Sequence, residues 1–289
     1  MTDLLLPLLD TSERRAAYQS VGQPTPVKVP LGRIHAHAIG FDDTVISIID
    51  RIASGLGGYV VTPNVDHVCT AQRDERLRSA YRDAWLAVPD GMPLLWIARA
   101  AGTPLPEKVS GSDLMVPLIR RVTKAGLRIA FCGSTPEVCE LAAQRTRALV
   151  PGVQICAREH PTYRAGHSSA DLRQSLAVLE AASPDLIFVA MSGPHQELFM
   201  QSFAAQLAPA VLIGIGGSLD FLAGATRRAP QWMQRSGLEW MFRLVNEPRR
   251  LAHRYLVRGW SIGPIAARTI ISSRLRAKHA RRIRVGPYF

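Results

Sequence analysis

The sequence has few of the features that mark secreted, metal-bound or membrane-spanning chains. Four cysteines occur in 289 residues and none forms a C-x-x-C pair, so we expect reduced thiols rather than disulfides or a zinc site. The longest apolar runs, at 186–191 and 210–215, are far shorter than the roughly 18 to 20 residues that span a bilayer. Acidic Asp3 precedes a short leucine run, unlike the basic start of a signal peptide. These absences predict a cytoplasmic globular protein.

Common cofactor motifs are also missing. The sequence has no G-x-x-x-x-G-K-[ST], no D-x-D, no H-E-x-x-H and no G-x-S-x-G, which disfavours P-loop, metal and serine-hydrolase chemistry. Its glycine cluster at 214–217 does not complete the dinucleotide fingerprint, because Leu219 stands at the last glycine place. An NAD-linked enzyme requires that fingerprint. We therefore expect a reaction that uses no metal or other cofactor.

Acidic residues are scarce at the C-terminal end. The whole chain has 35 Lys and Arg against 23 Asp and Glu, a net charge of +12. Residues 227–289 hold 15 basic and 2 acidic residues, so the preceding part is nearly neutral. Such asymmetry predicts a polyanionic partner: an anionic membrane, a phosphate-bearing substrate or a nucleic acid.

What is present is an alternation of short apolar runs with amphipathic helical patterns. This alternation predicts an α/β fold, Rossmann-like, with a mostly parallel sheet and helices on both faces. Strands are expected at 58–61, 85–88, 128–132, 186–191 and 211–215, and helices at 65–74, 92–101, 114–125, 136–149 and 196–207. We divide the chain into a loose leader (1–30) with one short helix at 12–19, a catalytic core (31–226) and a basic helical appendage (227–289).

The appendage has two expected parts. Residues 231–245 place apolar and aromatic side chains at helical spacing, and Glu247-Pro248 marks a break. Arg250, Arg254 and Arg258 then recur every four residues. A strip of arginines with few acids repels itself unless an anion meets it, which favours a membrane surface or a diphosphate over a merely solvated face.

Ligands of an open parallel sheet bind beyond the carboxyl ends of its strands. Asp90 follows the second expected strand and precedes Gly91, so it is either a general base or a residue that shapes the turn. Thr62 and Asn64 follow the first strand. They either hydrogen-bond a sugar or phosphate, or form a turn around Pro63.

Gly133 and Ser134 follow the third expected strand and precede a helix. They can hold a phosphate at a helix N-terminus, although ordinary capping has the same pattern. His67 and His195 also lie just past strands. We interpret both as polar loop residues rather than metal ligands.

Six motifs, in this order, closely resemble the WecG/TagA/CpsF family of bacterial glycosyltransferases. They are Thr62-Pro63-Asn64, Pro89-Asp90-Gly91, residues 107–113 (EKVSGSD), residues 193–197 (GPHQE), residues 214–220 (GIGGSLD) and Arg228-Ala229-Pro230. The resemblance covers residues 31 to about 254. It implies an inverting enzyme that transfers a sugar such as N-acetylmannosamine, its uronic acid or glucose from UDP to a polyprenyl-diphosphate-linked saccharide. It also implies a peripheral position at the inner face of the cell membrane.

The resemblance assigns roles to particular residues. Asp90 is similar to the base that deprotonates the acceptor hydroxyl, and Thr62 and Asn64 to active-site contacts of the sugar and acceptor. Gln196 matches the glutamine that contacts the nucleotide sugar. The resemblance implies that the UDP-sugar is contacted by Gly133, Ser134, Gly216 and Lys108. It implies that the lipid diphosphate is contacted by Arg243, Arg250 and Arg254.

Two motif positions depart from the family. Lys108 stands where arginine is common, and lysine keeps the charge but loses the two-pronged hydrogen bonding of a guanidinium. His195 replaces the usual lysine. Residues 261–289 extend past the matched part and add arginines that we interpret as extra membrane affinity.

One alternative from another class stays open. A nucleic-acid-binding protein would explain the basic appendage equally well, but not the six motifs, so we expect no nucleic-acid partner. The sequence leaves open which sugar is transferred, which acceptor receives it and whether the protein forms a homo-oligomer.

Overall fold

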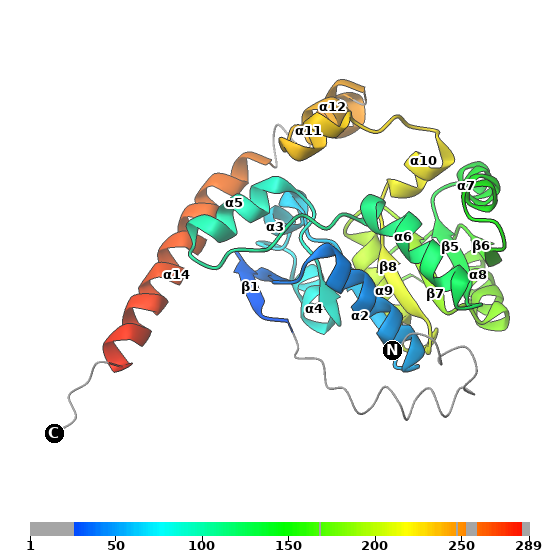
Figure 1. Cartoon of the computed structure of the whole chain (residues 1–289), viewed down its shortest axis with the longest axis horizontal. Coiled ribbons are helices and arrows are strands. Elements are labelled where there is room, and N and C mark those ends of the chain that lie inside the picture. Colours follow the sequence, from blue (N-terminus) through cyan, green and yellow to red (C-terminus); the bar gives the residue numbers. More distant parts are fainter. Residues whose placement is uncertain (1–25, 168, 247, 253–258, 285–289) are drawn as a thin grey trace.

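The computed structural model describes residues 26–167, 169–246, 248–252 and 259–284 (Figure 1). The short helix expected at 12–19 and the arginines at 254 and 258 lie outside these residues. The strands are β1 (Lys28–Leu31), β2 (Ile34–His37), β3 (Gly58–Val61), β4 (Leu86–Ala87), β5 (Arg128–Gly133), β6 (Gln154–Glu159), β7 (Leu186–Ala190) and β8 (Val211–Gly214). The helices are α2 (Phe41–Ala53), α3 (Val65–Thr70), α4 (Glu75–Asp83), α5 (Met92–Ala100), α6 (Gly111–Lys124), α7 (Pro136–Leu149), α8 (Ala170–Ala182), α9 (His195–Phe203), α10 (Ser218–Ala223), α11 (Gln231–Arg235), α12 (Glu239–Asn246), α13 (Pro248–Ala252) and α14 (Ile262–Arg284), with a 3-10 turn η3 (Gly259–Ser261).

The centre of the fold is a six-stranded sheet in the order β4-β3-β8-β7-β5-β6. Every strand pair in it is parallel, so the expected α/β fold is confirmed. The five expected strands all form. The sequence did not predict β6, an edge strand whose side chains are mostly exposed or half-buried, because such a strand has no continuous apolar run. It also missed the antiparallel hairpin of β1 and β2.

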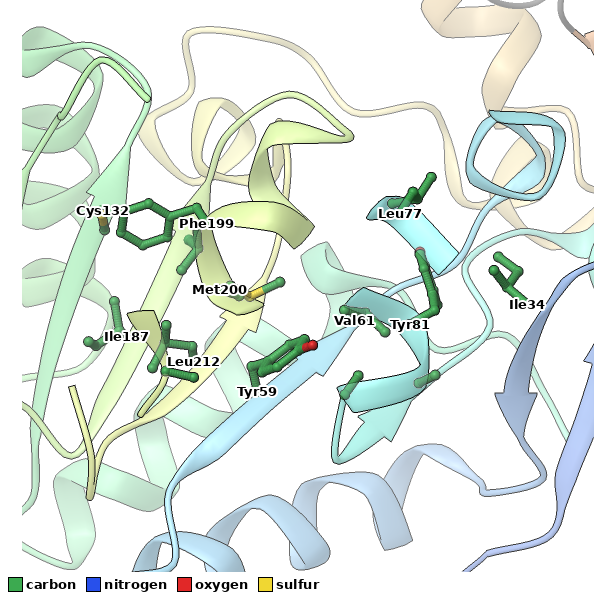
Figure 2. Close-up of a cluster of buried hydrophobic side chains, with 14 of the residues drawn as sticks. Ile34, Tyr59, Val61, Leu77, Tyr81, Cys132, Ile187, Phe199, Met200 and Leu212 are labelled. Carbon is green, nitrogen blue, oxygen red and sulfur yellow. The ribbon is translucent and has the colours of Figure 1, made fainter. Parts of the chain in front are cut away.

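Side chains alternate between two apolar layers, one on each face of the sheet. In β5, Ala130 and Cys132 face the layer that includes Phe199 of α9, while Ile129 and Phe131 face the layer with α2, α6 and α7. Figure 2 shows the first layer, where residues of β3, β7 and β8 meet those of α4 and α9. Burial on both faces explains why these strands are continuous apolar runs.

The prediction of one helix over residues 231–245 is wrong in one respect, because the structure has two helices there, α11 and α12. Gly237 lies between them with φ of 75°, a conformation that L side chains rarely adopt. A Cβ at Gly237 would lie 2.9 Å from Cβ of Met92. The break therefore lets the chain turn closely over α5, which helical spacing alone does not reveal. The expected start of the next helix at Pro248 is confirmed.

The long C-terminal helix α14 packs back on the body of the protein, against α5, α3 and β1 (Figure 1). Backbone N–H of Gly32 donates to Oγ1 of Thr269 over 3.2 Å, and the guanidinium of Arg274 donates to the carbonyl oxygen of Ala100. Within the described ranges, no helix combines the length and the apolar character that crossing a membrane requires.

Candidate active site

Asp90 lies where β4 ends, at the edge of the sheet formed by the carboxyl ends of the strands, which we call the carboxyl edge. Its backbone N–H donates to the carbonyl oxygen of Pro63 over 2.8 Å, which ties it to the residues after β3. Gly91 follows with φ of 124° and precedes α5. This glycine turn holds the Asp90 carboxyl at the start of a helix rather than along it.

The electrostatic surroundings of Asp90 suit a base. Burial raises its pKa to about 6, and the nearby carboxylates of Glu239 and Asp113 act in the same direction, while the charges of Lys108 and Arg243 lower it. Asp90 is half-buried, so part of it is accessible to solvent. A carboxyl with such a pKa is mostly ionised at pH 7 yet more basic than an ordinary aspartate, as proton abstraction near neutral pH requires.

Thr62 and Asn64 shape the same edge. The hydroxyl of Thr62 is buried and donates to the carbonyl oxygen of Gly214 over 3.2 Å, joining the ends of β3 and β8. Asn64 is the N-cap of α3, since its Oδ1 accepts from backbone N–H of His67 over 3.1 Å. Both residues therefore have structural partners.

Four charged side chains join the core to the appendage, and we call them the ion-pair network. Nζ of Lys108 lies 3.5 Å from a carboxylate oxygen of Asp113 and 3.5 Å from one of Glu239. Arg228 pairs with the same two acids, at 2.5 Å and 3.7 Å. Glu239 belongs to α12 and Asp113 to α6. The network therefore fixes the first turn of α12 beside Asp90.

Asp113 is firmly held in this network. Burial opposes ionisation, but the hydroxyl of Ser110, which donates over 2.5 Å, and the charges of Arg228 and Lys108 lower its pKa below the ordinary value. The Lys108 ammonium is consequently engaged by two carboxylates. Lys108 therefore has one partner in the core and one in the appendage.

Arg243 comes from α12 and reaches the glycine turn after β8. Its Nη2 lies 3.3 Å from the position of a Cβ on Gly217, and its guanidinium carbon lies 5.3 Å from the ring centre of Phe221. Its buried Nε has no hydrogen-bond partner among the residues that the structure describes. Arg243 thus brings a cation with unused donor capacity to the carboxyl edge near Asp90.

A cavity of about 350 Å³ opens at the carboxyl ends of β5 and β7. Gly133 and Ser134 form one wall, and the other lining residues are Thr135, Pro161, Tyr163, Ala190, Met191, Ser192 and His195. Gly133 has φ of 108°, and a Cβ there would lie 2.4 Å from the carbonyl oxygen of Ala190. Since Thr135 caps the 14-residue helix α7, the cavity meets a helix N-terminus, which favours anions.

Gln196 and Gly216 contact each other beside this cavity and are not among the residues that line it. Backbone N–H of Gly216 donates to Oε1 of Gln196 over 2.6 Å, and Nε2 of Gln196 donates to Glu197 over 2.9 Å. The Gln196 side chain is buried. The structure therefore gives Gln196 a role in holding the turn after β8.

The structure places the described residues of the expected site in separate groups along the carboxyl edge. Asp90, Lys108 and Arg243 interact electrostatically, and Gly133 and Ser134 share the cavity. The side chain of Arg250 and all of Arg254 lie outside the described part. Sequence reasoning missed the roles of Arg228, Asp113 and Glu239. Arg228 and Asp113 stand within quoted motifs, but spacing does not show that distant charges pair.

The fold defines an α/β protein, and its candidate site lies at the open edge of a parallel sheet, where ligands of such folds bind. The sequence profile described as Glycosyl transferase WecG/TagA/CpsF family matches residues 29–276. The chain belongs to this family and is a glycosyltransferase, which confirms the resemblance noted from its motifs.

Two bacterial relatives carry a more specific name. The chain is 30% identical over 194 residues to the N-acetylglucosaminyldiphosphoundecaprenol N-acetyl-beta-D-mannosaminyltransferase of Bacillus spizizenii, which covers 67% of this chain and 73% of that protein. It is 29% identical over 198 residues to the protein of the same name from Bacillus subtilis, covering 68% and 74% of the two chains.

Proposed function

We propose that this protein transfers an N-acetylmannosaminyl group from its UDP conjugate to N-acetylglucosamine carried on a polyprenyl diphosphate, with inversion at the anomeric carbon. The observation that carries the chemistry is Asp90, a half-buried carboxyl with a pKa of about 6 at the carboxyl edge. The choice of sugar and acceptor is supported by the names of the two relatives.

Asp90 would act as the general base. As the acceptor oxygen forms its bond to the anomeric carbon, the bond from that carbon to the UDP oxygen breaks, and the acceptor proton passes to the Asp90 carboxylate. A single displacement of this kind inverts the configuration and needs only one carboxylate on the protein. Thr62 and Asn64 would position the sugar or acceptor, because they lie on the segment whose Pro63 carbonyl accepts from Asp90 N–H.

The leaving UDP carries growing negative charge that must be stabilised. The cavity at Gly133 and Ser134 lies at the N-terminus of α7, where backbone N–H groups and the helix dipole favour phosphate. Arg243 lies at the glycine turn, and its Nε has no hydrogen-bond partner in the described part of the chain. Its guanidinium would bind a diphosphate, either that of the leaving group or that of the lipid acceptor.

We also propose that the appendage lies on the anionic inner face of the cell membrane. Four of the five tryptophans are exposed, and three of them lie in the appendage: Trp232, Trp240 and Trp260, at 63%, 40% and 79%. Tryptophan is favoured at membrane–water interfaces, and basic side chains near an anionic surface each contribute about 1 kcal/mol. A polyprenyl substrate is confined to that surface, so the site and its acceptor would meet there.

The test is transfer from a panel of UDP-sugars to a short-chain polyprenyl-diphosphate N-acetylglucosamine, with the product and its anomeric configuration followed by NMR. Selective turnover of UDP-N-acetylmannosamine to a β-linked product is expected if that donor is the α-anomer. Turnover of another UDP-sugar would keep the reaction class and replace the donor. Absence of turnover with every donor, together with tight salt-dependent RNA or DNA binding, would overturn the proposal.

A further inference from the structure

A chain of buried polar contacts runs from α4 to the turn after β8. The hydroxyl of Tyr81 lies 2.8 Å from Nδ1 of His67, and Nε2 of His67 lies 3.8 Å from Oε1 of Glu197. The same Glu197 oxygen accepts from Nε2 of Gln196 over 2.9 Å, and Oε1 of Gln196 accepts from N–H of Gly216 over 2.6 Å. Four elements of the fold are therefore linked through side chains that solvent barely reaches.

Glu197 is the unusual member of this chain. It is fully buried, which is costly for a carboxyl unless it has partners. Its second oxygen, Oε2, is buried without a hydrogen-bond partner among the residues that the structure describes. The catalytic scheme proposed above makes no use of Glu197. A buried acid retained beside a ligand site calls for a physical reason.

The amide of Gln196 supplies that reason. A backbone N–H can only donate, so Gly216 requires the oxygen of the Gln196 amide to face it. The amide nitrogen must then face the opposite side, where a carboxylate is the strongest available acceptor. Glu197 occupies that side. Without an acceptor there, nothing distinguishes the two orientations of the amide except the Gly216 contact itself.

Two glycines lie directly against this chain of contacts. A Cβ on Gly214 would lie 2.5 Å from Nε2 of Gln196, and a Cβ on Gly193 would lie 2.5 Å from Nε2 of His67. Gly193 precedes α9 and Gly214 ends β8. The close approach means that neither glycine could carry a side chain without displacing Gln196 or His67.

We propose that Glu197 is a positioning residue of the donor site: with His67 behind it, it orients the Gln196 amide, which holds the turn at Gly214–Gly217. The proposal rests on the proposed function in one respect, that the donor binds at this edge. The same turn receives Arg243 at Gly217. Loss of Glu197 would therefore weaken donor binding without removing any group that touches the reacting atoms.

The main experiment measures the KM for the UDP-sugar and the Kd for UDP in Glu197→Leu, which removes the acceptor. We expect both to rise about 10-fold, the effect of one lost buried hydrogen bond, with the KM for the lipid acceptor unchanged. Glu197→Gln keeps an acceptor oxygen in the same place but replaces the charged acceptor by a weaker neutral one, so it should raise both by about threefold. Hydrogen exchange of the segment 211–220 should be faster in Glu197→Leu.

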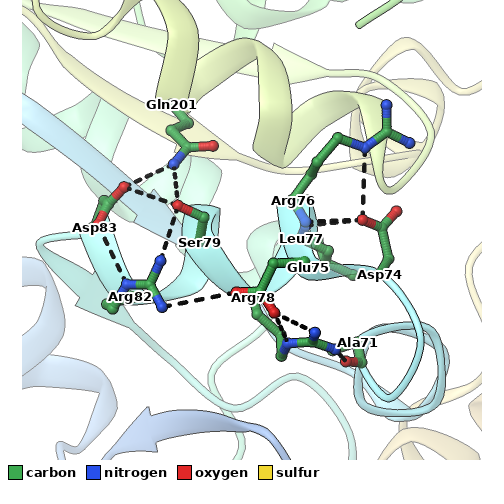
Figure 3. A network of polar contacts seen from close by, with 10 residues as sticks. All are labelled: Ala71, Asp74, Glu75, Arg76, Leu77, Arg78, Ser79, Arg82, Asp83 and Gln201. Carbon is green, nitrogen blue, oxygen red and sulfur yellow. Dashed lines mark hydrogen bonds and ion pairs between the residues drawn. The ribbon is translucent and has the colours of Figure 1, made fainter.

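Gln201→Leu is the matched control. Gln201 lies on the same helix α9, and its amide donates to Ser79 and Asp83 of α4 (Figure 3). This variant removes a polar contact of α9 that is separate from the chain to Gly216. It should leave the donor KM and the exchange of 211–220 at wild-type values even where it lowers Tm.

The outcomes separate the two proposals. If wild type binds no UDP, the proposed function fails. If wild type binds UDP and Glu197→Leu is folded but matches Gln201→Leu in donor KM and UDP Kd, the positioning role is overturned. Should Glu197→Leu not fold, Glu197→Gln decides: unchanged UDP Kd together with unchanged exchange of 211–220 also overturns it, whereas a threefold weaker Kd supports it.

Discussion

The core and the appendage hold their parts of the site by different forces. Asp90 stands on a strand end within a sheet that is buried on both faces. Helix α12 has no buried residue, and two of its contacts with the core involve charged side chains: Glu239 with Lys108, and Arg243 over the Phe221 ring. Apolar packing fixes geometry under all ionic conditions, whereas ion pairs near a surface weaken with salt. We therefore expect the position of Asp90 to depend little on salt and the position of Arg243 to depend on it more strongly.

The largest effect is expected in the core, at Asp90. Asp90→Asn removes the base while keeping the shape of the side chain, so kcat should fall by about 100-fold or more, with Tm close to wild type. Transfer assays under saturating donor and acceptor measure this change. Nearly full activity in a folded Asp90→Asn protein would show that Asp90 is not the base, and a residue of the appendage would then be the next candidate.

The next largest effect is expected at Arg243, the appendage residue that reaches the edge. Arg243→Met keeps much of the stem packed on Phe221 but removes the guanidinium, and kcat/KM should fall by about 10- to 100-fold, since a hydrogen bond to a charged group contributes about 1.5–3 kcal/mol. Arg121→Met, at an exposed position on α6, is the charge-matched control and should retain wild-type kinetics. Equal losses in both variants would show that only net charge matters.

A smaller effect is expected for membrane affinity. Trp232→Ala combined with Trp260→Ala should weaken binding to anionic phosphatidylglycerol vesicles by about 10-fold, because each side chain would lose part of its apolar burial in the interface. Sedimentation with vesicles measures the change. Leu149→Ala, an exposed apolar residue of α7 in the core, is the control. A matching loss in that control would mean that the appendage has no special contact with lipid.

The smallest effect is a shift in pH dependence. The charge of Glu239 raises the pKa of Asp90 and that of Lys108 lowers it. If Asp90 is the base as proposed, activity requires its ionised form and should be lost as pH falls through about 6. Glu239→Gln should move this loss to lower pH, and Lys108→Met should move it to higher pH. The pH profile of kcat/KM reports both. Shifts in the same direction would contradict an electrostatic link between appendage and core.

Several features of this protein were open to prediction because they are local. The strand Gly58–Val61 and the helix Pro136–Leu149 have the predicted bounds, since apolar runs and a Thr-Pro helix start are sequence signals. Asp90 was placed correctly at a strand end for the same reason. The edge strand β6 lacked such a signal, because its exposed positions tolerate polar residues.

The sequence by itself determined the α/β class, the five apolar strands, the charge imbalance and the motifs that place the chain in its glycosyltransferase family. Only the tertiary structure decided that α12 is separated from α11 at Gly237, that Glu239 and Arg228 pair with Lys108 and Asp113, and that Gln196 faces Gly216. The physical reason is distance along the chain. Periodicity and turn chemistry act within a few residues, whereas ion pairs and buried amide contacts join segments that only the packed sheet brings together.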